Sequence, residues 1–223
     1  MRFSVFCVII SAVILFIPVW VFGQDAVTVV EGVGEGGVES ISAISGEVEL
    51  KRLYFPVYTA YQERDWESVR LHAETFLRAV SVSEGIAADN EFVLGVKKMF
   101  AMSYLEVKEG GQEQAEKLYE EIVAIAPDES DSRITLAILK MELSRDGAVE
   151  SAMRLADEFP GELSIQRAVG LHLQGEHRGA DAEKYLKAAL KLAPQDIMIA
   201  TQLGSIYDQS GRYFELISLY EQL

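Results

Sequence analysis

The side chains that most often carry out catalysis or bind metals are scarce in this sequence. His172 and His177 lie five residues apart, whereas two ligands on one helix face need a spacing of about three or four residues. The third histidine, His72, falls in a charged helical stretch. Neighbouring carboxylates such as Glu120 and Glu121 are typical of solvated helix surfaces and helix ends. We therefore expect no catalytic residue and no metal site.

One pattern of the kind that binds nucleotides does occur. Gly32, Gly34 and Gly37 form a G-x-G-x-x-G after the strand-like AVTVV. A dinucleotide site also needs a long helix that opens there inside a βαβ unit, but Gly46 interrupts the segment and no parallel strand follows. Cys7 is the only cysteine, which leaves the rest of the chain without a disulfide or a thiolate site. We expect no cofactor and no enzyme activity, with an unrecognised active site as the remote alternative.

Composition and charge narrow the class of partner. The chain has 223 residues and is 49% hydrophobic, which is enough to build the core of one or two domains. Its net charge is −15. Phosphate binding is driven by Lys and Arg, so nucleic acid is not the expected partner.

The first 46 residues differ from the rest. Residues 1–23 have one basic residue, Arg2, and then an apolar run, which is typical of a signal peptide. A run of about twenty apolar residues also suits an uncleaved membrane anchor. Residues 24–46 contain five glycines and no Lys or Arg, which favours a flexible linker. Both alternatives predict export to the periplasm or to the outer face of the cytoplasmic membrane, with membrane contact only through the first segment.

The remainder of the sequence is periodic. Three prolines recur at intervals of 33 and 34 residues, and an alanine precedes each proline by twelve. The pairs are Ala115 with Pro127, Ala148 with Pro160, and Ala182 with Pro194. A fixed period of this length predicts stacked helix pairs. Small residues, including Gly170 and Gly204, allow two helices to approach closely, and each proline ends a helix. A generic antiparallel bundle with coincidental spacing is the alternative.

These residues also carry a family resemblance. The unit that ends at Pro194 resembles a tetratricopeptide (TPR) repeat, and the last unit is similar to it. The matching residues are Gly170, Leu173, Ala182, Leu186, Ala189 and Pro194, followed by Leu203, Gly204, Tyr207, Gly211, Tyr213 and Tyr220. Leu216 stands where alanine is usual, and the earliest unit has Val69 there and no closing proline.

The resemblance implies an all-α fold over residues 47–223, a TPR-like helix-hairpin solenoid with a right-handed superhelix. The expected repeats are approximately 50–83, 95–128, 129–162, 163–196 and 197–223. Pro56 lies in the first of these helices, where we expect it to mark a start or a kink.

In the TPR family the first helix of each pair lines a concave surface, which implies a set of partner-binding residues. They are Lys97, Phe100, Tyr104, Arg133, Ala137, Lys140, Arg167, Leu171, Gln174, Thr201, Ser205 and Asp208. One hypothesis is that the basic members bind an acidic segment or a C-terminal carboxylate, with Arg133 and Arg167 as bidentate donors. The alternative is that they pair with neighbouring glutamates. Either way, the resemblance implies a non-catalytic protein-interaction scaffold of the cell envelope.

The last helix raises a second possibility. Leu216, Leu219, Tyr220 and Leu223 form an apolar stripe that no later unit in this sequence covers. Such a stripe is expected in a piece of a longer protein, at a self-association surface or at a docking face. The alternative function is therefore a membrane-anchored assembly component that associates through its solenoid ends.

Overall fold

The computed structural model describes residues 46–106 and 110–222, and within these ranges it contains ten helices and no strand. The helices are α2 (Glu47–Gln62), α3 (Trp66–Ser81), α4 (Glu91–Leu105), α5 (Gln112–Ile125), α6 (Ser130–Glu142), α7 (Ala148–Glu158), α8 (Leu163–Gly175), α9 (Gly179–Leu192), α10 (Ile197–Gln209) and α11 (Tyr213–Glu221). The predicted signal or anchor segment, the glycine pattern, nearly all of the predicted linker, and Leu223 lie outside the described residues. None of the described helices is long and apolar enough to cross a bilayer.

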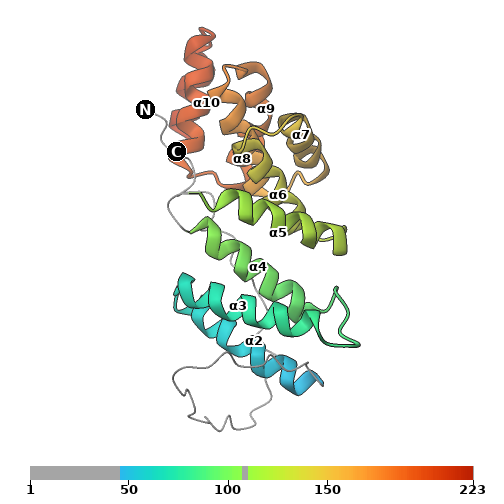
Figure 1. Cartoon of the computed structure of the whole chain (residues 1–223). Coiled ribbons are helices and arrows are strands. Elements are labelled where there is room, and N and C mark those ends of the chain that lie inside the picture. The colour runs from blue at the N-terminus through green and yellow to red at the C-terminus, as the bar shows by residue number, and fades with distance from the viewer. Residues whose placement is uncertain (1–45, 107–109, 223) are drawn as a thin grey trace. The chain divides into compact units, whose positions relative to one another are not determined.

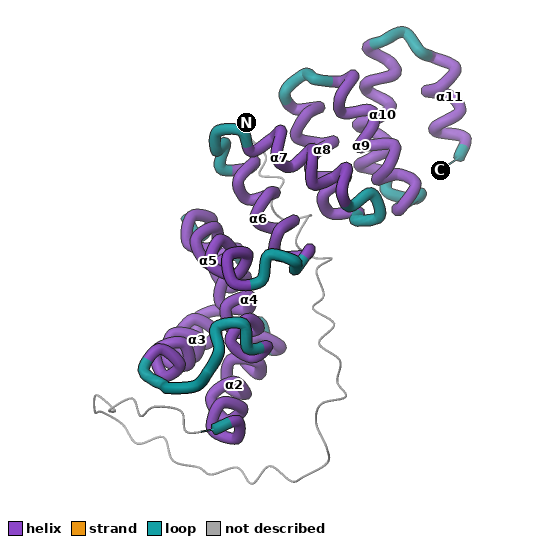
Figure 2. Tube along the Cα trace, turned by 90° about the vertical axis from the view of Figure 1, so that its right-hand side faces the viewer, coloured by secondary structure: helices purple, strands orange, loops and turns teal. Residues whose placement is uncertain are grey.

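The helices pack as consecutive hairpins (Figure 1). Each even-numbered helix packs on the odd-numbered helix that follows it, and each odd-numbered helix packs on the next even-numbered one. We call α2, α4, α6, α8 and α10 the first helices and the other five the second helices. The tube in Figure 2 shows the purple helices following one another in this order. The chain is therefore an all-α, TPR-like helix-hairpin solenoid, as predicted.

Small residues hold the two helices of a hairpin together. Ala115, Ala148 and Ala182 begin or lie near the start of three second helices, and each is at most 6% exposed. On the facing first helix, a Cβ added to Gly170 would lie 2.8 Å from the Leu186 side chain. The predicted close approach is confirmed at these positions.

The prolines end the second helices as predicted. Ala126, Phe159 and Ala193 each precede a proline and cap α5, α7 and α9. Their ψ angles are 75°, 68° and 76°, far from helical values. The ring of the following proline disfavours helix at these positions. Pro56, by contrast, neither starts nor ends a helix, because α2 runs from Glu47 to Gln62 with Pro56 exposed inside it.

Four of the five first helices end in one recurring turn. Arg64, Ser144, His177 and Gly211 follow α2, α6, α8 and α10 with positive φ angles of 57°, 53°, 63° and 69°. The next residue donates its backbone N–H to a carbonyl five positions back, as Arg145 does to Lys140 over 2.9 Å. This is the Schellman motif, which satisfies the last carbonyls of a helix. The motif fixes the direction in which the chain enters each second helix.

Candidate protein-interaction surfaces

Arg133 on α6 makes two hydrogen bonds to one carboxylate of the chain. Its two terminal nitrogens donate to the two carboxylate oxygens of Glu158, both over 2.8 Å. Its guanidinium lies 5.2 Å from the ring centroid of Phe159. The hydrogen bonds from Arg133 lower the pKa of Glu158. Arg133 is thus a bidentate donor to a carboxylate of the same chain, and its binding of a partner carboxylate stays a prediction.

Arg167 occupies the equivalent place on α8. Its Nη1 lies 3.4 Å from a carboxylate oxygen of Asp196, and its side chain is 13% exposed. Asp196 is also the N-cap of α10, where its other oxygen accepts from the backbone N–H groups of Met198 and Ile199 over 3.0 and 3.1 Å. Arg167 therefore links one helix pair to the start of the next.

The two predicted lysines have similar partners. Lys97 on α4 lies 2.6 Å from Glu121 on α5, and Lys140 on α6 lies 2.7 Å from Glu120 on α5. All four basic members of the predicted partner-binding residues consequently lie beside carboxylates of the chain, which is the alternative that the sequence left open. An acidic partner that binds here must replace these carboxylates.

The remaining predicted residues differ in exposure. Phe100 is only 8% exposed and packs on Tyr104, with the ring centroids 5.1 Å apart. Tyr104 and Gln174 are half-buried, whereas Asp208 is exposed. Thr201 is exposed as well, and its hydroxyl donates to the Ile197 carbonyl over 2.7 Å. Phe100 is therefore mainly a core residue, while the others remain accessible on the first helices.

Sequence reasoning missed a second series of charges, which links consecutive helix pairs. An arginine in the Schellman turn of one pair reaches a glutamate on the second helix of the preceding pair. The contacts are Arg145 with Glu116 at 2.6 Å, Arg178 with Glu150 at 3.8 Å, and Arg212 with Glu183 at 2.7 Å. The arginines are spaced by 33 and 34 residues and the glutamates by 34 and 33. The same period that revealed the prolines could have revealed this ladder of ion pairs.

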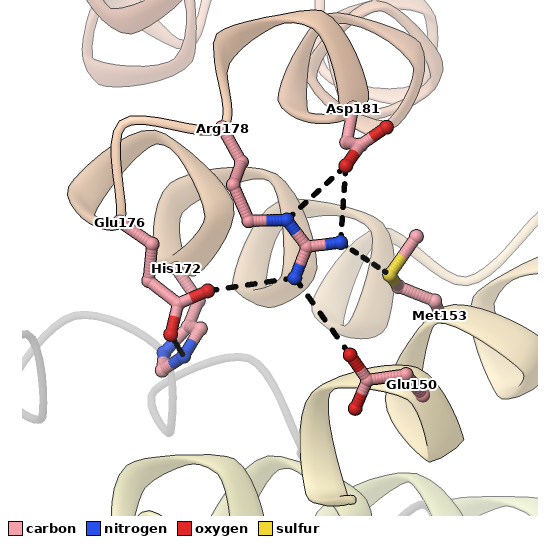
Figure 3. A network of polar contacts seen from close by, with 6 residues as sticks. All are labelled: Glu150, Met153, His172, Glu176, Arg178 and Asp181. Carbon is pink, nitrogen blue, oxygen red and sulfur yellow. Dashed lines mark hydrogen bonds and ion pairs between the residues drawn. The ribbon is translucent and has the colours of Figure 1, made fainter.

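Arg178 is the most connected member of the ladder (Figure 3). It donates to Asp181 on α9 over 3.0 and 3.1 Å and approaches Glu150 on α7 and Glu176 after α8. A terminal nitrogen also lies 3.8 Å from the Met153 sulfur. One side chain thus contacts two helices and the turn between α8 and α9.

The histidines do not gather into a site. His172 Nε2 lies 3.4 Å from Glu176, and His177 is the exposed residue of positive φ in the turn after α8. Over residues 46–106 and 110–222, no three His, Cys, Asp or Glu side chains are grouped so that they could hold a metal ion.

The exposed apolar residues of α11 differ from the predicted end-docking set. Leu219 is only 7% exposed and belongs to the core. Leu216 is half-buried because it packs toward Gly204, and Tyr220 is 49% exposed. Three neighbours are more exposed than any of these, namely Phe214 at 87%, Tyr213 at 60% and Ile217 at 56%. The periodicity placed the stripe on α11 but did not identify its exposed side.

The fold defines a class, the TPR-like solenoids, and solved structures of one such protein, MamA, are similar to this chain. MamA AMB-1 is 18% identical, with a TM-score of 0.59 over 78% of this chain and 90% of that chain. MamA MSR-1 is 17% identical, with a TM-score of 0.57 over 79% and 95%. Another crystal structure of MamA is 12% identical, with a TM-score of 0.63 over 79% and 91%. At these identities the similarity shows the fold alone. No protein-family model and no curated protein matches the chain.

Proposed function

We propose that this protein is a non-catalytic scaffold that binds a partner protein through its first helices. The observation that carries this proposal is the equivalent placement of Arg133 and Arg167, one repeat apart on α6 and α8. Solenoids of this kind present a continuous surface built from one helix of each pair. The similarity to MamA, a TPR-like helical protein, supports the fold on which this proposal rests.

The partner segment is acidic and binds by exchange of carboxylates. In the free protein Arg133 is held by Glu158, whose side chain is 50% exposed, so water already competes for that contact. An exposed ion pair contributes at most about 1 kcal/mol, which a partner carboxylate can offset. Arg167 is less exposed and lies beside the N-cap Asp196. We therefore expect Arg133 to bind the partner directly, with Arg167 next to it.

Charge reversal tests this function. The protein and its Arg133→Glu/Arg167→Glu variant are used to capture partners from envelope extract, and captured proteins are identified by mass spectrometry. The matched control is Arg52→Glu/Arg78→Glu, which changes the charge equally at exposed positions on α2 and α3. The proposal predicts a partner that the control retains and the first variant loses. Equal capture by both variants would exclude the first-helix surface.

We further propose that the protein acts outside the cytoplasm. The support is the sequence of residues 1–23, with one arginine followed by an apolar run. Cell fractionation with an alkaline wash tests this proposal. Recovery in the periplasmic fraction fits a cleaved signal, recovery in washed membranes fits an anchor, and recovery in the cytoplasm contradicts export.

A second candidate function is assembly through the solenoid ends. Ile217 on α11 stands 34 residues after Glu183, the ladder glutamate of α9, and is 56% exposed. An apolar side chain therefore occupies the place where earlier pairs carry an acid. Analytical ultracentrifugation of the wild type and of Ile217→Glu tests this candidate. It predicts a concentration-dependent mass that the substitution removes, and a monomer at all concentrations contradicts it.

A further inference from the structure

A groove lies between the second helices α9 and α11, and none of the four predicted partner-binding cations lines it. Its volume is about 580 Å³. Leu190 and Pro194 line it from α9 and the segment that follows, and Phe214 lines it from α11. Leu203 and Tyr207 of α10 form its floor, since they line the groove and are 2% and 4% exposed.

The corresponding place one repeat earlier carries an ion pair. Lys184 on α9 lies 2.6 Å from Asp157 on α7. The residues 34 positions later are Ser218 on α11 and Lys191 on α9. Ser218 cannot pair with a lysine as a carboxylate does, so the contact that bridges α7 and α9 has no counterpart between α9 and α11.

Because this ion pair is missing between α9 and α11, Lys191 has no charged partner among the described residues at the edge of the groove. The other two charged lining residues are already paired, Lys187 with Glu183 at 2.6 Å and Glu215 with Arg212 at 2.9 Å. Within the described part of the chain, Lys191 has no carboxylate within 4.0 Å. The groove therefore combines an apolar lining with one available positive charge.

The walls of the groove restrict what can bind in it. They are mostly helical, and the backbone N–H and C=O groups in the interior of each helix are already hydrogen-bonded within it. An extended peptide would find no backbone partners there and would bury unpaired polar groups. A helical segment satisfies its own backbone, so it can place apolar side chains in the groove without this penalty.

From these observations we infer that the α9–α11 groove binds an amphipathic helix of a partner protein, which inserts apolar side chains beside Phe214 and sets a carboxylate opposite Lys191. Phe214 replaces Ala180 of the preceding repeat and is 87% exposed, which makes it the main apolar contact. The carboxylate takes the place that Lys184 has opposite Asp157 one repeat earlier, with the two charges exchanged. This inference does not depend on the proposed function of the first helices.

The probe is a fluorescent 14-residue helical peptide with leucines on one face and glutamates beside them, and a matched peptide has glutamine for glutamate. Fluorescence anisotropy measures both against the full chain. We expect the glutamate peptide to bind about three- to fivefold more tightly at low salt, which is the range of one exposed ion pair. Lys191→Gln should remove that difference, and Phe214→Ser should weaken both peptides at least tenfold. Both side chains are exposed, so neither substitution should affect folding.

Two controls and a second measurement complete the test. Lys117→Gln, on the exposed side of α5, and Arg133→Glu should leave both affinities unchanged. Equal binding of the two peptides to the wild type, or unchanged binding to Phe214→Ser, would overturn the inference. Analytical ultracentrifugation tests whether a second copy of this chain occupies the groove instead. A concentration-dependent dimer that Phe214→Ser dissociates and Ile217→Glu does not would also overturn it.

Discussion

Gly170 on α8 and Leu186 on α9 approach so closely that a Cβ on Gly170 would lie 2.8 Å from two carbons of the leucine and 3.1 Å from its backbone nitrogen. The contact joins the two helices of one hairpin, and any side chain at position 170 would separate them. The last hairpin has a contact of the same kind, since a Cβ added to Gly204 on α10 would lie 2.6 Å from the Tyr220 hydroxyl and 3.1 Å from the Leu216 side chain.

Gly170→Ala should therefore destabilise the protein. Overpacking in a filled core costs about 1–3 kcal/mol, which exceeds the gain of about 0.5–1 kcal/mol from removing a glycine inside a helix. Urea denaturation followed by circular dichroism measures the change. Gly175→Ala is the matched control at the end of α8, where a Cβ would contact nothing within 4 Å. A Gly170→Ala variant as stable as this control would contradict the contact.

Ser144→Gly should stabilise the protein. Ser144 has a φ of 53° in the turn after α6, a conformation that costs a residue with a Cβ about 1–2 kcal/mol. Glycine adopts it without that cost but loses more backbone entropy on folding, so we expect a net gain of about 0.5–1 kcal/mol. Gly211→Ala, at the equivalent turn after α10, should lower stability by a similar amount. In thermal denaturation, we expect Ser144→Gly to raise the melting temperature and Gly211→Ala to lower it. Changes of the same sign would exclude strain at these turns.

Stability should fall in acid partly through Glu116. The hydrogen bond from Arg145 lowers the pKa of this buried carboxylate from its ordinary value of 4.5. Since the folded-state pKa lies below the unfolded-state pKa, the contribution is complete above that ordinary value and is lost as pH falls through the folded pKa. Melting temperatures between about pH 6 and pH 3 should decrease more steeply for the wild type than for Arg145→Gln. Parallel curves would show that this pair does not contribute.

Substitutions of Asp196 should distinguish its contribution as a helix cap from its contribution as a charge. It caps α10 through two backbone N–H groups and lies beside Arg167. Asp196→Ala removes both contacts and should cost about 1–2 kcal/mol, whereas Asp196→Asn keeps an N-cap oxygen and should cost only a few tenths. Urea unfolding of both variants gives the comparison. Equal losses would mean that the ion pair, and not the cap, is the main contribution.

Much of the fold was predictable because periodic residues perform a packing role that repeats. Ala148 and Ala182 lie at the same kind of helix contact, and Pro160 and Pro194 follow helix ends of the same conformation. A side chain that touches only its own hairpin or the next one experiences the same surroundings in every copy. Its spacing in the sequence therefore reports its place in the structure.

The candidate sites were harder to predict, because they depend on which neighbour a side chain meets. Arg133 and Arg167 occupy equivalent positions, yet one binds Glu158 of α7 and the other approaches the N-cap of α10. The equivalent of Glu158 in the following repeat is Leu192, so Arg167 has no acid there. Likewise, Leu219 shares the helical stripe of Tyr220 but turns into the core. Helical spacing shows which residues share a face of a helix, but it does not show which of them are exposed.

The central claim is that successive helix pairs stack in one register, with the Schellman turn of one pair placed against the second helix of the pair before it. Arg145 and Glu116 report on this register, because they are 29 residues apart and meet only if the turn between α6 and α7 lies against α5. A double-mutant cycle with Arg145→Gln and Glu116→Gln, measured by urea unfolding, tests the contact. The structure predicts that the double variant loses clearly less stability than the two single losses combined. Strictly additive losses would contradict the stacking.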